Sequence, residues 1–251
     1  GRVTGGSSAV NTCIALRGQD YDYDEWAEHG GDHWRFAHCL PYFKRLENDL
    51  DFDNEWHGNE GPIAIRRHPP EELVAAQRGF LADCERLGRP QCSDHNDPNQ
   101  SGAGPHAMNK VEGRRISTAL GYLEPARGRR NLVIQAHTHV ARVLVARGRV
   151  TGLELLRDGQ LERVECDRVV LAAGAVATPG ILMRSGIVPR EVLAPLGIDV
   201  VKEAPVGVGL LDHPGAAVIF APEPGANHPT QPAIQCTMRY TPEAGQPDAR
   251  H

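Results

Sequence analysis

The spacing of apolar and polar positions predicts a mainly helical first half and a mainly extended second half. Between residues 20 and 49, apolar side chains recur at helical intervals around a break at Gly30-Gly31, so two short helices are expected. An amphipathic helix is predicted over 71–87, where the same period recurs and Gly88 supplies the stop. The expected buried face of the first two helices consists of Trp26, Trp34, Leu40, Phe43 and Leu46.

The segments around these helices lack helical periodicity. A turn over 57–62 precedes a short predicted strand over 63–65. Residues 93–112 are polar and rich in Asp, Asn, Gly and Pro, which predicts an ordered surface loop or a lid. Ser117 is placed to cap a short helix that runs through Tyr122.

The second half predicts short strands that are separated by tight turns. The turn signals are Arg147-Gly148 and Asp158-Gly159, and the alternation between them indicates an antiparallel meander. An apolar run over 168–174 predicts a strand that is buried on both faces. The remaining predicted elements are strands over 131–136, 140–146, 150–156, 160–166 and 198–201 and helices over 175–184 and 190–196.

Composition excludes several classes of protein. The 251 residues are 40% hydrophobic and 24% charged, as expected for a folded globular protein, and the net charge of −5 argues against nucleic-acid binding. The most apolar stretch, 169–183, is too short to cross a bilayer and contains Pro179, so no transmembrane segment is expected. Six scattered cysteines without a Cys-x-x-Cys pair favour free thiols in a cytoplasmic protein.

The histidines do not predict a metal site. His29 and His33 have a helical spacing, but Gly30-Gly31 breaks the helix between them and no third ligand is near. His137 and His139 share one strand face, which is more often a solvated or hydrogen-bonded pair. We therefore expect no metal.

A glycine-rich segment near the start is the first candidate for chemistry. In Gly5-Gly6-Ser7-Ser8 the glycines let backbone amides approach an anion, and the serines add hydroxyl donors. A tight turn without a ligand explains the same run equally well. Because the chain begins inside this loop, at Gly1, we expect it to be an internal piece of a longer protein. No Gly-x-Ser-x-Gly motif marks a hydrolase nucleophile.

The motifs that follow the glycine run give it weight. Gly-Gly-Ser-Ser, Asn11, Arg17-Gly18 and the Asp-Tyr-Asp-Glu-Trp of 22–26 together resemble the first signature of the glucose–methanol–choline (GMC) family of flavin oxidoreductases. Residues 174–187 are similar to the second signature. Residues 207–214 are similar to the family's Gly-x-Asn-Leu-x-Asp-His-Pro, with Gly209 where Asn is usual. The resemblance covers residues 1 to about 214 in the family's order.

The resemblance implies an α/β fold. It is that of an FAD/NAD(P)-binding, Rossmann-like domain without its first β-α unit, with the antiparallel meander and the start of an α+β substrate domain. The partial FAD-binding domain spans 1–214, with interleaved substrate-domain segments at about 40–115, and the C-terminal substrate domain starts in 215–251. The nucleotide-binding Gly-x-Gly-x-x-Gly is expected upstream of Gly1, because the match at 102–107 contains a proline and follows no predicted strand.

The resemblance also implies an FAD site. Val140 taken alone is a core valine, and only the resemblance places it beside the nucleotide. Val10 stands where members with covalently attached flavin have a histidine, so non-covalent FAD is expected. The expected cofactor-binding residues are Val3, Gly5, Gly6, Ser7, Ser8, Asn11, Thr12, Cys13, Ile14, Val140, Gly174 and Ala175.

The implied activity is choline- or alcohol-dehydrogenase-like: FAD-dependent oxidation of the CH–OH group of a small-molecule alcohol, with hydride transfer to flavin N5. The catalytic histidine and its His or Asn partner are expected downstream of His251, so no catalytic residue is expected in this chain, which alone should be inactive. Oxygen and a carrier both remain open as electron acceptor. The alternatives are a non-oxidative lyase of the same family and a cofactor-free remnant that acts as an interaction domain.

Overall fold

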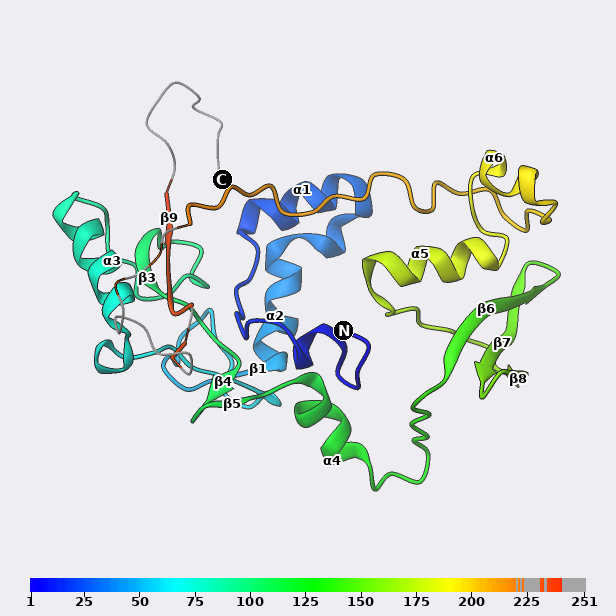
Figure 1. The fold of residues 1–251 in the computed structure, drawn as a ribbon, viewed down its shortest axis with the longest axis horizontal. Helices are drawn as coiled ribbons and strands as arrows, with labels where there is room; N and C mark the ends of the chain where they lie inside the picture. Colours follow the sequence, from blue (N-terminus) through cyan, green and yellow to red (C-terminus); the bar gives the residue numbers. More distant parts are fainter. Residues whose placement is uncertain (220, 222, 224–230, 233, 241–251) are drawn as a thin grey trace. The chain divides into compact units, whose positions relative to one another are not determined.

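The computed structural model describes residues 1–219, 221, 223, 231–232 and 234–240. Its contacts divide the chain into two compact units: Gly1–Leu132 with the described residues after 219, and Val133–Ile219. Each unit combines helices with a small sheet or sheets, which is the α/β composition expected (Figure 1). The predicted start of a substrate domain at 215 stays a prediction, and residues 241–251 lie outside the described part.

Two short helices open the first unit, as predicted. After a 3-10 turn, η1 (Gly6–Ala9), come α1 (Asp20–Gly30) and α2 (Phe36–Leu46), which are joined by the 3-10 turn η2 (Asp32–Trp34). The Asp22 carboxylate accepts the Gln19 N–H at 2.7 Å and closes a capping box at the start of α1. Gly31, at φ +97°, follows its last residue.

The predicted buried face of these helices is partly wrong. Trp26, Trp34 and Leu46 are exposed, whereas Phe36 is the buried aromatic residue. The two tryptophan rings pack edge to face, 5.8 Å apart, and Trp26 also meets Tyr23. The aromatic side chains therefore pack against one another at the surface and are not covered by another part of the fold.

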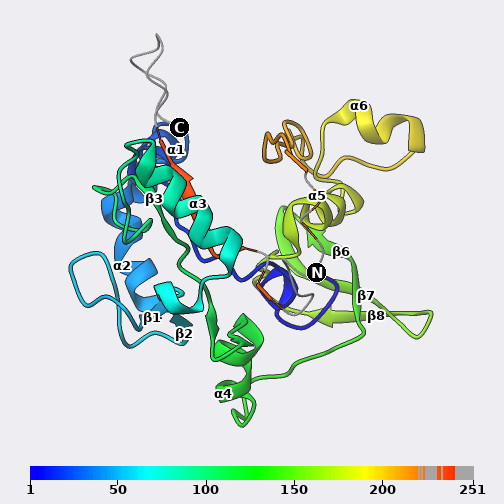
Figure 2. The same ribbon diagram turned by 60° about the vertical axis from the view of Figure 1, so that its left-hand side comes forward.

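The third predicted helix is present but shorter. It comprises a 3-10 turn, η3 (Pro70–Glu72), and then α3 (Ala75–Arg86), because Leu73 and Val74 are extended. Strand β3 (Gly102–Pro105) pairs antiparallel with β9 (Cys236–Arg239), and α3 lies beside β3 (Figure 2). The predicted strand over 63–65 is β2 (Ile63–Ile65), which pairs in parallel with β1 (Glu47–Asp49).

The predicted surface loop over 93–112 is wrong. It contains β3 and β4 (Lys110–Val111), which forms a hairpin with β5 (Arg114–Arg115). Its polar side chains are interior because ion pairs and hydrogen bonds inside the unit satisfy most of them. The buried polar residues of this segment are Asp94, His95, Asn96, His106 and Asn109.

A small apolar core supports this arrangement. Ile63, Ile65 and Ala107 form a buried cluster against which Ala15 and Ile116 pack. The helix predicted after Ser117 is present as the π-helix η4 (Ala119–Leu123), followed by α4 (Glu124–Ala126). Its first residues are held by Ser117, whose hydroxyl accepts the Leu120 N–H at 3.4 Å.

The second unit contains the predicted meander. Strands β6 (His139–Ala146), β7 (Arg149–Arg157) and β8 (Gln160–Glu165) pair antiparallel in that order. Both connecting turns have two residues with positive φ, 52° and 74° at Arg147-Gly148 and 49° and 81° at Asp158-Gly159. These are the dihedral signs of type I′ hairpin turns, whose twist matches that of the strands.

The two helices predicted for the second unit are present. α5 (Gly174–Arg184) contacts β6, and α6 (Arg190–Leu193) leads into the 3-10 turn η5 (Ala194–Leu196). Ser185 joins α5 to the sheet, because its hydroxyl accepts the Val143 N–H at 2.8 Å and donates to the Ile181 carbonyl.

Three predicted strands, over 131–136, 168–174 and 198–201, are wrong. Each lies outside the ladders, and 198–201 adjoins only an isolated bridge between Ile187 and Lys202. Val170, expected to be buried on both faces, is 92% exposed. Strands need a row of paired backbone groups, and among the described residues these three segments have only isolated bonds, such as that from the Val201 N–H to the Gly186 carbonyl at 2.8 Å.

Two further observations concern the chain as a whole. All six cysteines lie within the described residues, and each is a free thiol. Among the helices that the structure describes, none has the length and apolar character needed to cross a membrane.

Candidate functional site

The glycine turn of the first unit is open toward one side. Gly5 and Gly6 have φ values of +91° and +57°, and no atom lies within 4 Å of the position that a Cβ on Gly6 would take. Ser7 is exposed, whereas the Ser8 hydroxyl donates to the Gly5 carbonyl at 2.6 Å and accepts the Thr118 N–H at 3.0 Å. Ser8 therefore closes the turn, and Ser7 is the serine that stays available to a ligand.

The residues after the turn form a tightly held bend. The Asn11 side-chain oxygen accepts the Cys13 N–H at 3.0 Å and a hydrogen bond from Arg115 at 2.5 Å. Cys13 is buried and has a φ of +65°, a left-handed conformation that costs a non-glycine residue about 1–3 kcal/mol. Its carbonyl accepts the Asn109 N–H at 2.9 Å, so both sides of Cys13 are fixed.

A cavity of about 430 Å³ opens beside Thr12 and Cys13. The sequence predicted these two residues, whereas the other walls come from the β4-β5 hairpin, from Met108, and from the segment that precedes β9. The sequence signal for the hairpin was the dipeptide Glu112-Gly113. Both residues have positive φ, and this two-residue turn places Lys110 opposite Arg115. The lining residues are Thr12, Cys13, Met108, Lys110, Gly113, Arg115, Pro232 and Ile234.

Three of the predicted cofactor residues belong to the second unit. Val140 lies in β6, and its carbonyl accepts a hydrogen bond from Arg184 of α5 at 3.4 Å. Gly174, at φ +88°, and Ala175 form the first residues of α5, and open space surrounds the Cβ position of Gly174. The structure thus brings Val140 and the start of α5 into one unit, and the residues from Val3 to Ile14 into the other.

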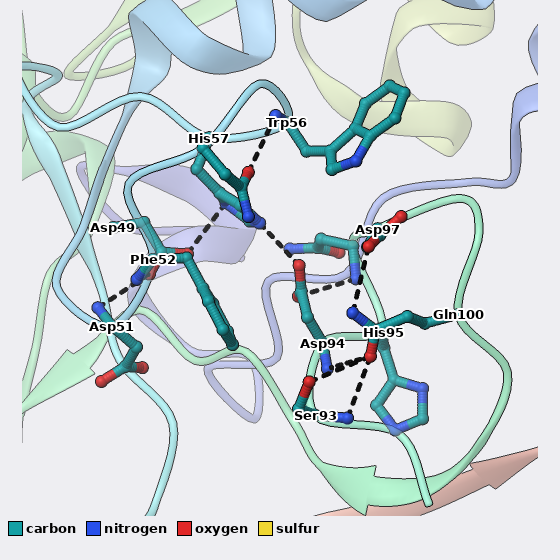
Figure 3. Close-up of polar contacts among 12 residues, drawn as sticks. Asp49, Asp51, Phe52, Trp56, His57, Ser93, Asp94, His95, Asp97 and Gln100 are labelled. Carbon is teal, nitrogen blue, oxygen red and sulfur yellow. Dashed lines mark hydrogen bonds and ion pairs between the residues drawn. The ribbon is translucent and has the colours of Figure 1, made fainter. Parts of the chain in front are cut away.

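Sequence reasoning missed a buried set of charged side chains in the first unit. Figure 3 shows the His57 ring between Asp49 and Asp94. Its Nδ1 donates to Glu47 and to Asp49, each at 3.0 Å, and its Nε2 donates to Asp94 at 2.6 Å. Its side chain is 0% exposed. The next residue, Gly58, packs directly against the backbone of α2, because a Cβ there would lie 1.8 Å from the Lys44 carbonyl oxygen.

These contacts set the protonation of the buried groups. Burial opposes a charge on His57, but hydrogen bonds to Asp49, Asp94 and Glu47 outweigh it and raise the pKa to about 10. Burial likewise opposes ionisation of Asp49 and Asp94, yet the hydrogen bond from His57 and the charge of Arg67 hold both pKa values below the usual range. His57 is therefore an imidazolium that donates from both ring nitrogens.

Two arginines complete the buried set. Arg67 donates to Asp49 at 2.9 Å and to Asp94 at 2.6 Å, and Arg17 donates to Glu47 at 2.5 Å. Ligand atoms of Glu47, Asp49 and His57 lie within 4.8 Å of one another, as in a metal site. Each of the two carboxylates already binds an arginine and His57, which is the arrangement of an ion-pair network.

The buried network also holds residues 15–17, which follow the cavity residues Thr12 and Cys13 in the chain. The Asn96 side chain accepts the Arg17 N–H at 2.9 Å and donates to the Ala15 carbonyl at 3.0 Å. Asn96 itself is positioned by Asp94, which accepts its backbone N–H at 3.0 Å. The buried charges thereby hold 15–17 in place, directly after the bend that presents Thr12 and Cys13.

Comparison with known proteins gives this site its context. Residues 1–215 match the family model described as GMC oxidoreductase. An uncharacterised GMC-type oxidoreductase of Rhodococcus erythropolis is 40% identical over 215 residues, which cover 85% of this chain and 43% of that protein. Human mitochondrial choline dehydrogenase is 38% identical over 215 residues, covering 85% of this chain and 36% of that protein.

Solved structures agree with the sequence relatives. Pyridoxine 4-oxidase from Mesorbium loti superposes with a TM-score of 0.75 at 32% identity, over 79% of this chain and 39% of that one. The chain spans about two fifths of the length of these relatives and neighbours. With a family model matched over most of its length, the chain belongs to the GMC oxidoreductase family.

Proposed function

We propose that this chain is the FAD-binding part of an oxidoreductase that oxidises the CH–OH group of a small-molecule alcohol. The observation that supports this most is that the GMC match over 1–215 includes the cavity walls at Thr12 and Cys13. When bound, FAD supplies the hydride acceptor, at N5 of its flavin ring. The catalytic base is proposed to come from outside this chain.

The residues of the first unit suit such a cofactor. The open face at Gly6 admits a ligand close to the backbone, and the exposed Ser7 side chain adds a donor. Asn11 and Arg115 hold the bend so that the Thr12-Cys13 backbone is presented in one conformation. In the second unit, the uncapped first turn of α5 at Gly174 and Ala175 offers further backbone donors.

Non-covalent attachment is part of the proposal. Val10, 59% exposed, carries no nucleophile that could bond to a flavin ring. A cytoplasmic location is proposed as well, since the free thiols of all six cysteines suit a reducing compartment. The proposed electron acceptor is either oxygen or a carrier.

The test is the visible spectrum of the full-length protein that contains this chain. We expect a flavin spectrum, release of the flavin on denaturation, and bleaching of the bound flavin by an alcohol without oxygen. Flavin that no alcohol bleaches would favour a lyase, and a colourless protein that binds no added FAD would contradict the proposal. Gly6→Val should lower flavin occupancy because of its positive φ, whereas Gly79→Val, at an equally open position of α3 without positive φ, should not.

A further inference from the structure

The cavity beside Thr12 and Cys13 has two cationic side chains in its wall, Lys110 and Arg115. We propose that it binds an anionic oxygen group, a carboxylate or a phosphate, between them. This rests on the proposed function and deepens it, because the site would then take either the charged group of an acidic alcohol or a phosphate of the cofactor.

The strand register points to this ligand. Lys110 and Arg115 are direct partners across the two-stranded β4-β5 hairpin. Like charges in directly opposite positions destabilise a strand pair. An anion between the two cations removes the repulsion. Two facing cations thus lower the stability of the hairpin but favour the binding of an anion, and such a conflict is common at functional sites.

The charges of both side chains are available to a ligand. Neither forms an ion pair with a carboxylate in the part of the chain that the structure describes. Arg115 binds only neutral oxygens, those of Asn11 at 2.5 Å and of the Ser8 backbone at 3.3 Å, both through one terminal nitrogen. These bonds fix the guanidinium and leave its other donors free. By contrast, Arg66 and Arg67 of the same unit form ion pairs with carboxylates through both terminal nitrogens.

The same wall is unsuited to a quaternary ammonium ion. Such cations are held by aromatic faces, and the described lining has none. Two positive side chains would also repel them. We therefore expect the ligand of this cavity to differ in charge from choline, although relatives such as human choline dehydrogenase are named for that substrate.

The test is calorimetric titration of the full-length protein with sodium phosphate, sodium acetate and choline chloride, against a sodium chloride baseline. Phosphate and acetate should bind to the wild type and about tenfold more weakly to Lys110→Met, as expected for loss of one charge-assisted hydrogen bond. Lys110→Arg should restore the affinity. Lys202→Met, which makes the same change in net charge in the second unit, should bind like the wild type.

A stability measurement separates binding from misfolding. In buffer without phosphate or carboxylate, Lys110→Met should unfold at a higher temperature than the wild type, because the repulsion across the hairpin is gone. Phosphate should raise the unfolding temperature of the wild type and leave that of Lys110→Met nearly unchanged.

Saturation with FAD identifies the source of the anion. If acetate still binds, the cavity takes an acidic substrate; if FAD displaces phosphate and itself binds Lys110→Met more weakly, the anion is a cofactor phosphate. Equal phosphate affinity in the wild type and Lys110→Met, or choline binding as tight as acetate binding, would overturn the proposal. Absence of flavin or of alcohol oxidation in the wild type tests the proposed function instead, because phosphate binding to the full-length protein freed of its flavin is measured without either.

Discussion

The polar segment 94–96 is buried in the first unit, whereas the apolar segment 169–172 lies largely open in the second. Asp94, His95 and Asn96 are between 1% and 4% exposed, while Val170 is 92% exposed. The polar segment has partners for its charges and amides, and the apolar segment lacks a neighbouring strand among the described residues. Burial therefore follows the partners that the fold supplies more closely than local hydropathy.

The largest effect is expected where the buried partners are removed. Asp94→Ala leaves His57 and Arg67 without one of their anions, which should lower the free energy of unfolding by about 3–5 kcal/mol in urea denaturation. Asp83→Ala, at the exposed Asp83–Arg86 pair of α3, should stay close to the wild type. A similar small loss in both variants would mean that the network stabilises no more than a surface ion pair.

An intermediate effect should appear as pH changes. His57, with its pKa raised from 6.5 to about 10, contributes stability that is complete below pH 6.5 and lost as pH rises through 10. Burial lowers the pKa of His106 from 6.5 to about 4, so its contribution is lost as pH falls through that range. The depressed carboxyl pKa values of Asp49 and Asp94 remove stability at lower pH still.

The free energy of unfolding should consequently be greatest near pH 6.5, as measured by urea titrations between pH 4 and pH 10. His57→Gln should flatten the alkaline side, and the part of the acidic side that comes from His106 should remain. An alkaline side that is equally steep in this variant would show that His57 is not its source.

The smallest effect is expected at the exposed apolar segment. Val170→Ser should change the free energy of unfolding by less than about 0.5 kcal/mol, because the side chain makes few contacts. Leu155→Ala, in the buried part of β7, should cost about 2–5 kcal/mol. A large loss for Val170→Ser would show that this segment is covered in solution.

Elements with local signals were predictable. The meander followed from alternation and from the dipeptides Arg147-Gly148 and Asp158-Gly159, which adopt the positive φ values that such turns require. The structure of 168–174 was not predictable in the same way. An apolar run indicates a preference for burial, but a strand also needs a neighbouring strand to pair with. The burial of residues 94–96 was not predictable for the converse reason, since their partners lie up to 144 positions away in the chain.

The same distinction between local and distant contacts applies to the residues of the candidate site. Thr12 and Cys13 belong to a contiguous motif, and the resemblance indicated them directly. Lys110 and Arg115 reach the cavity through a hairpin, so only the turn at Glu112-Gly113 could have placed them opposite each other. Pro232 and Ile234 join the wall through β9, which pairs with a strand more than 130 residues earlier in the chain, and no local pattern predicts that contact.

The buried network has a consequence for how the sequence can evolve. Its fully enclosed members balance in formal charge, three positive against three negative. A single replacement that alters this balance leaves a charge stranded away from water, so drift at one member should require a compensating replacement at another. Across related chains these positions should accordingly vary as linked pairs or not at all. The six positions are Arg17, Glu47, Asp49, His57, Arg67 and Asp94.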